Sequence, residues 1–184
     1  MDPISNHGNS FSFYEKIYAV ISWLSPKASF LKLISFLHAF LTACKPYEID
    51  FLLSGSLAVF MHAQDPDLII HDVDLACPES QFSLLEELMR YAHFQVQLRD
   101  YHVLQVTHKK LKIDLDSLEF WYRDIPMSTE CCKINRHQIK ILSLESLLAF
   151  YQMGVDTKYG HPEEFEKYSA LKYKLDLMEE LIDI

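Results

Sequence analysis

Two aspartates separated by one residue lie in the segment His71-Asp72-Val73-Asp74-Leu75, whose apolar residues predict a β-strand. Successive side chains on a strand point to opposite faces, so Asp72 and Asp74 are expected side by side. Such close carboxylates repel each other unless a cation lies between them, and hard oxygen ligands favour Mg²⁺ or Mn²⁺. The segment therefore fits a divalent-cation site, and it fits equally well an amphipathic strand with a solvated acidic face.

A Gly-Ser pair, Gly55-Ser56, lies between the mostly apolar run Ile49–Leu53 and a segment of helical character, Leu57–Ala63. Glycine allows a ligand to approach the backbone closely, and the free N–H groups at a helix N-terminus attract phosphate. The Ser56 hydroxyl adds a hydrogen-bonding group. The same pair also suits an ordinary helix cap, so it becomes informative only beside other motifs.

A third group of charged residues alternates with apolar ones in the segment from Leu111 to Asp116. On a strand, Lys112, Asp114 and Asp116 would share one face, opposite the apolar residues. A carboxylate on this strand would complete a metal site or act as a general base. The alternative is a polar outer face without a catalytic role.

The order of these three segments resembles the nucleotidyltransferase superfamily that shares the catalytic fold of DNA polymerase beta. In that family a Gly-Gly or Gly-Ser turn precedes a helix, an Asp-x-Asp strand follows, and a later strand carries a single Asp. The small lincosamide-type and abortive-infection-type nucleotidyltransferases are the most similar in pattern. The resemblance covers Phe51–Leu118, with a weaker similarity over Ile139–Leu148.

The resemblance implies a role for each matching residue. Gly55 and Ser56 would hold the triphosphate, and Asp72 and Asp74 would bind two divalent ions, Mg²⁺ or Mn²⁺. Asp114 would be the third carboxylate, which shares the catalytic metal and helps to deprotonate the acceptor hydroxyl. The implied reaction moves a nucleoside monophosphate from an NTP, with ATP as the expected donor, to a hydroxyl of a small molecule or protein.

Many proteins of the abortive-infection type carry a lysine shortly after a Ser-Leu-Glu segment. In this sequence Tyr151 occupies the comparable place. Lys158, Lys172 and Lys174 are candidates to replace it for contact with phosphate or a base, and the sequence selects none of them. Asp116 is the reserve candidate for the third carboxylate. The missing lysine also leaves a second function open: a catalytically degenerate nucleotidyltransferase fold that acts as a nucleotide-binding or protein-interaction module.

The charge of the chain limits its partners. It has 26 acidic and 17 basic residues and a formal net charge of -9. Phosphate backbones require a basic footprint, so an RNA acceptor is less favoured, whereas a bound cation can bridge carboxylates to a nucleotide. The most apolar stretch, Phe30–Cys44, is shorter than the roughly 20 residues of a membrane span, so no membrane span is expected.

The cysteines and the N-terminus favour a cytoplasmic protein. Met1-Asp2-Pro3 lacks the basic start of a secretory signal. Cys131, Cys132 and His137 lack the usual spacing of a zinc site, and free thiols in a reducing compartment are expected instead.

Apolar periodicity predicts an α/β (α+β) fold, with a mixed sheet flanked by helices. Helices are expected at Phe13–Leu24, Phe30–Ala43, after Pro78, from the candidate N-cap Ser143 onward, and from Pro162 to the end. Strands are expected at Ile49–Leu53, Leu68–Ala76 and Gln138–Leu142, and as a meander over Phe94–Leu98, Val103–Thr107 and Leu111–Leu115, with an irregular stretch from Ile125. These elements divide into an N-terminal helical segment (1–45) packed on the core, a catalytic core (46–142) and a C-terminal helical segment (143–184).

Overall fold

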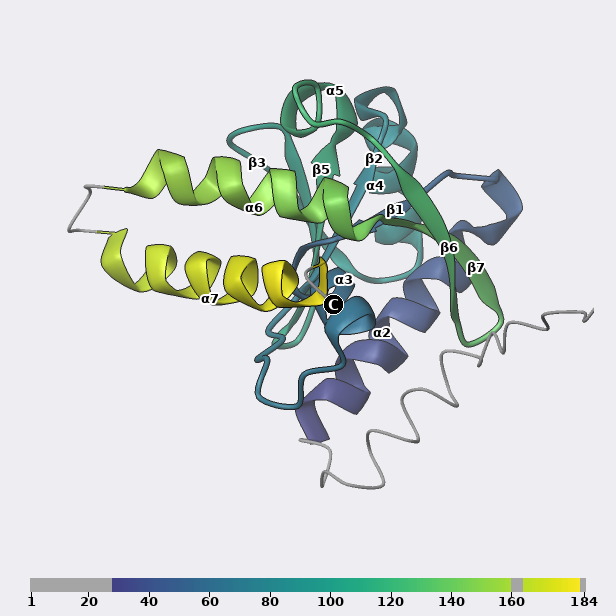
Figure 1. The fold of residues 1–184 in the computed structure, drawn as a ribbon. Coiled ribbons are helices and arrows are strands. Elements are labelled where there is room, and N and C mark those ends of the chain that lie inside the picture. The colour runs from purple at the N-terminus through teal and green to yellow at the C-terminus, as the bar shows by residue number, and fades with distance from the viewer. Residues whose placement is uncertain (1–27, 160–163, 183–184) are drawn as a thin grey trace, which may run out of the picture.

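A computed structural model describes residues 28–159 and 164–182 of the chain (Figure 1). The predicted helix Phe13–Leu24 lies outside the described residues. The elements are, in chain order, α2 (Ala28–Cys44), the 3₁₀ turn η1 (Lys45–Tyr47), β1 (Leu52–Ser54), α3 (Gly55–Ala63), β2 (Val73–Cys77), η2 (Glu79–Gln81), α4 (Phe82–Tyr91), β3 (Gln95–Arg99), β4 (Val103–His108), β5 (Leu111–Ser117), α5 (Leu118–Trp121), β6 (Thr129–Ile134), β7 (His137–Leu142), α6 (Leu144–Lys158) and α7 (Phe165–Ile182).

A mixed sheet of seven strands forms the centre of the described part of the chain, in the order β3-β4-β5-β2-β1-β7-β6. Strands β3, β4 and β5 pair antiparallel as consecutive neighbours, which confirms the predicted meander. Strand β2 runs parallel to β5 and antiparallel to β1, and β1 runs parallel to β7. The mixed sheet with its flanking helices confirms the predicted fold class.

Strands β4 and β5 have one buried apolar face and one more polar face. On β5, Ile113 and Leu115 are fully buried, and they pair with Val106 and Leu104 of β4. Helix α2 contacts β5, and α4 contacts β3 and β4. Burial of these alternate side chains fixes the register, because a shift of one residue would expose the whole apolar set. The polar residues between them therefore lie together on the opposite face.

Helices α6 and α7 lie side by side as a hairpin and contact α3 (Figure 1). Ser143 caps α6: its hydroxyl accepts a hydrogen bond from the Ser146 backbone N–H, as predicted. Leu175 and Met178 are the buried residues of α7. This packing brings α7 against α3, the helix that begins at Gly55.

Strand β6 was not expected, since the sequence after Ile125 was interpreted as irregular. It is an edge strand that pairs only with β7, and most of its side chains are exposed. An edge strand of this kind lacks the buried apolar alternation by which strands are recognised in a sequence. The strand predicted at Leu68–Ala76 is also shorter than expected, because β2 begins at Val73.

None of the helices in the described residues is both long enough and apolar enough to cross a membrane.

Candidate active site

The register of the sheet aligns polar residues from four strands in one row. Ser54 of β1 pairs with Asp74 of β2, which pairs with Asp114 of β5, which pairs with Gln105 of β4. Directly paired residues point to the same face of a sheet. Residues separated by as many as 60 positions in the chain are therefore neighbours on the polar face.

Asp72, Asp74 and Asp114 each place a carboxylate oxygen within 4.8 Å of the other two. The three are partly buried, and their oxygens are hard ligands of the kind that Mg²⁺ and Mn²⁺ prefer. Across residues 28–159 and 164–182 no other group of His, Cys, Asp or Glu has this spacing. Cys131, Cys132 and His137, weighed as a zinc site, form no such group.

Asp74 is the carboxylate most affected by its surroundings. Burial, followed by the charges of Asp72 and Asp114, raises the pKa of Asp74 to about 7. The charged form of this carboxyl is therefore disfavoured by its neighbours. A cation within the group would reverse that effect.

Lys112 supplies a positive charge to this group. Its Nζ lies 2.6 Å from Asp72 Oδ2 and 3.0 Å from Asp114 Oδ2. Burial acts to lower the pKa of Lys112, but the hydrogen bonds and charges of the two carboxylates hold it above its ordinary value. Gln105 Nε2 donates to the other oxygen of Asp114, Oδ1, at 2.9 Å. Both oxygens of Asp114 are thus engaged.

Gly55 lies between β1 and α3, and its backbone packs against the Asp74 carboxylate. Its φ of +64° lies in the left-handed region, and a Cβ at this position would lie 1.8 Å from Asp74 Oδ2. Glycine is therefore required both for the turn and for the approach of Asp74. The buried Ser56 follows at the beginning of α3, where backbone N–H groups are free to bind an anion.

The structure selects one of the three lysines that the sequence left open. Lys174 Nζ, from α7, donates to Ser56 Oγ at 2.6 Å and lies 5.3 Å from the centre of the Tyr151 ring. Lys158 pairs instead with Glu164, and Lys172 with Asp176. Lys174 therefore lies beside both Ser56 and Tyr151.

Burial lowers the pKa of Lys174, and the charges of Asp74 and Asp72 partly offset this. No sequence motif pointed to Lys174, because it is 118 residues from Ser56 in the chain. The only indication in the sequence was Tyr151, which stands where the family resemblance led us to expect a lysine.

Asp116 lies one row further along the sheet, opposite Ala76, and is not part of the group of three carboxylates. The Tyr122 hydroxyl donates to Ser54 Oγ at 2.8 Å and lies 3.5 Å from Asp116 Oδ2. Burial, with the charges of Asp74 and Asp114, raises the pKa of Asp116 to about 8. The aromatic ring of Tyr122 is buried and stacks on Phe150 at 5.1 Å, so it packs in the core.

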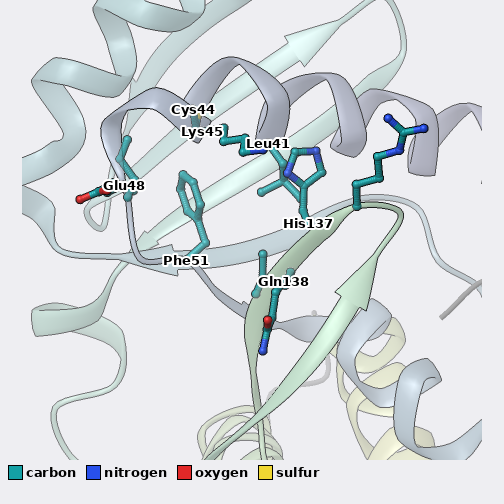
Figure 2. A pocket seen from close by; sticks show the side chains of 10 residues that line it. Leu41, Cys44, Lys45, Glu48, Phe51, His137 and Gln138 are labelled. Atoms are coloured by element: carbon teal, nitrogen blue, oxygen red, sulfur yellow. The ribbon is translucent and has the colours of Figure 1, made fainter. Parts of the chain in front are cut away.

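A separate pocket of about 210 Å³ lies where the end of α2 meets the start of β7 (Figure 2). Leu41, Phe51 and Ile139 form apolar parts of its wall, and Lys45 and His137 are among its polar residues. Asp72, Asp74 and Asp114 are not among its lining residues. The pocket is therefore separate from the row formed by Ser54, Asp74, Asp114 and Gln105.

Comparison with known proteins supports the same architecture. No protein-family model and no curated protein matches the sequence. The solved structure of the antibiotic-resistance factor ANT(2'')-Ia is similar, with a TM-score of 0.57 and 17% identity over 82% of this chain and 89% of that one. An antigenic nucleotidyltransferase-like protein from Paracoccidioides brasiliensis matches with a TM-score of 0.58 and 15% identity, over 80% of this chain and 75% of that one. The described chain therefore has the nucleotidyltransferase fold.

Proposed function

We propose that the protein is a metal-dependent nucleotidyltransferase, which transfers a nucleoside monophosphate from an NTP, with ATP as the expected donor, to a hydroxyl of an acceptor. One observation carries the proposal: three clustered carboxylates face the N-terminus of α3 where Lys174 contacts Ser56. The cluster suits a divalent cation, and the helix N-terminus with its lysine suits phosphate. An NTP with bound metal joins these two requirements in one ligand.

The residues present fit a divalent metal such as Mg²⁺ or Mn²⁺. Asp72, Asp74 and Asp114 supply only oxygen ligands, and the ammonium of Lys112 already lies against two of them. Divalent metal held by these three carboxylates would neutralise the negative charge that develops during displacement at the α-phosphorus.

The protein's own groups then bind and orient the reactants. The backbone at Gly55, the Ser56 hydroxyl and the Lys174 ammonium would hold the triphosphate. Asp114 would accept the proton of the acceptor hydroxyl at a carboxylate oxygen, while Gln105 fixes its orientation through Oδ1. Most of the rate enhancement would come from positioning and charge stabilisation.

The proposed acceptor is a small molecule or a protein. ANT(2'')-Ia is described as an antibiotic-resistance factor, which supports a small-molecule acceptor for a chain with the same fold. The net charge of -9 disfavours RNA. The four cysteines are unpaired, in keeping with a cytoplasmic location.

Transfer of α-labelled nucleotide tests the proposal. Each of the four NTPs is offered with Mg²⁺ or Mn²⁺ and a panel of hydroxyl-bearing acceptors, with Asp74→Asn as the control. Labelled product from the wild type but not from Asp74→Asn supports the proposal. Equal labelling by both would exclude catalysis at this site.

The alternative, a degenerate nucleotide-binding module, makes a different prediction for calorimetry. Tight binding of Mg²⁺ and ATP without transfer to any acceptor would favour it. The contact of Lys174 with Ser56 favours the enzyme, since it supplies the amine that is absent at Tyr151.

A further inference from the structure

Lys112 lies between two of the three carboxylates that would hold a metal ion. Its Nζ contacts Oδ2 of Asp72 and Oδ2 of Asp114, one oxygen from each. The other oxygen of Asp114 accepts from Gln105, so Oδ2 is the oxygen left for a cation. The ammonium therefore occupies oxygens that a metal ion would need.

Gln105 is itself held in one orientation. Arg99 donates to Gln105 Oε1 through Nη2 at 3.0 Å and Nε at 3.3 Å. Because the amide oxygen accepts from Arg99, the amide nitrogen must donate to Asp114. Oδ1 of Asp114 is consequently held by Gln105. A cation can therefore compete with Lys112 only for Oδ2 of Asp114.

The location of Lys112 allows it to move away. It lies next to the turn at Lys109-Lys110, and about a third of its side chain is exposed. A lysine ammonium is a compact charge on a flexible four-carbon stem, and the freed ammonium can be hydrated by water. The ion pairs can therefore break without rearrangement of the strand.

We infer that Lys112 is an internal counter-ion of the metal site, which a divalent ion displaces from Asp72 and Asp114 on binding. This inference rests on the proposed metal site and assigns Lys112 a role in setting metal affinity. In the metal-free protein the ammonium limits the repulsion among the carboxylates. Its displacement opposes metal binding, so the protein binds the ion more weakly than the three carboxylates alone would.

Two measurements on the full chain test the inference without relying on nucleotide transfer. The first is the reactivity of the Lys112 amine toward acetic anhydride, read by mass spectrometry with and without Mn²⁺, with the exposed Lys110 as internal reference. The second is Mn²⁺ affinity, by calorimetry, of the wild type, Lys112→Met and the matched control Lys110→Met.

Displacement predicts that Mn²⁺ increases acetylation of Lys112 severalfold relative to Lys110. It also predicts that Lys112→Met binds Mn²⁺ at least about tenfold more tightly than the wild type. Lys110→Met, which removes one charge from the same turn, should bind within about twofold of the wild type. Because the acetylation experiment uses the wild type, it holds even if Lys112→Met is poorly folded.

The opposite results separate this inference from the proposed function. Mn²⁺ binding that leaves the acetylation of Lys112 unchanged, or reduces it, would overturn displacement while the metal site and the proposed activity stand. Lack of Mn²⁺ binding by both the wild type and Lys112→Met would overturn the inference. The transfer assay would then decide separately whether the proposed activity survives. Binding by Lys112→Met alone would also overturn displacement, because the ion would then be unable to remove the ammonium in the wild type.

Discussion

Asp74 occupies the space that a side chain at position 55 would need. A Cβ on Gly55 would lie 1.8 Å from Asp74 Oδ2 and 2.7 Å from the Asp74 Cβ, and the φ of +64° disfavours any other residue. The positions of the Gly55 turn and of Asp74, the second aspartate of the Asp-x-Asp segment, therefore depend on each other.

Gly55→Ala should consequently destabilise the protein and disrupt the site together. The left-handed backbone costs about 1–2 kcal/mol for alanine, and the displacement of Asp74 adds to this. Urea denaturation and Mn²⁺ calorimetry check both effects. Gly154→Ala in α6 is the matched control, since its Cβ would meet only Leu171, at 3.4 Å, and alanine favours a helix. Equal Mn²⁺ affinity in Gly55→Ala and wild type would contradict the close packing.

Asp114→Asn and Asp116→Asn should differ sharply. Asp114 belongs to the carboxylate cluster, so its loss should weaken Mn²⁺ binding and lower transfer at least about a hundredfold. Asp116 lies outside this cluster, and burial raises its pKa and so favours the neutral carboxyl, which asparagine resembles. Asp116→Asn should therefore retain Mn²⁺ binding and keep its activity within about tenfold of wild type. The reverse ranking would make Asp116 the third carboxylate.

Lys174→Ala should raise the KM for the NTP about tenfold or more with a smaller effect on kcat. A hydrogen bond to a charged group contributes about 1.5–3 kcal/mol, and the Lys174 ammonium lies at the proposed phosphate position beside Ser56. Steady-state kinetics over a range of NTP concentrations measures the change. Lys172→Ala removes a lysine from the same helix that pairs with Asp176, and should leave KM unchanged. A similar KM increase in both variants would indicate a general effect of charge.

The buried thiols should make the protein less stable in alkali. Burial raises the pKa of Cys44 and Cys77, and of the partly buried Cys132, to about 12 from an ordinary value of 9.0. The unfolded chain releases these protons near pH 9, while the folded chain retains them, so the free energy of unfolding falls as pH rises above 9. Denaturant titrations at pH 8 and pH 10 measure this loss, which should be smaller in Cys44→Ala than in the wild type.

Alkylation provides an independent check on the same thiols. Cys131 is exposed, so iodoacetamide at pH 8 should modify it before the other three in the native protein. Simultaneous modification of all four cysteines under native conditions would show that the buried thiols are accessible.

Local periodicity was sufficient to predict many parts of this protein from its sequence. Alternation of apolar and polar residues predicted the meander that carries Asp114. It also predicted a strand through Asp74, whereas Asp72 lies in a bend just before β2. Ser143 was predictable as a cap because capping depends on a few adjacent residues. Strand β6 escaped prediction because an exposed edge strand needs no apolar alternation.

Contacts between distant segments were decided only by the tertiary structure. The pairing of β2 with β5 brings Asp114 rather than Asp116 beside Asp74, although both point to the same face of the strand. Packing of α7 against α3 selects Lys174 from three lysines that are equivalent in the sequence. The sequence by itself determined which residue types the site contains, because side-chain direction is set by local backbone geometry. Which of them meet depends on strand register and helix packing, which are set by burial of the whole core.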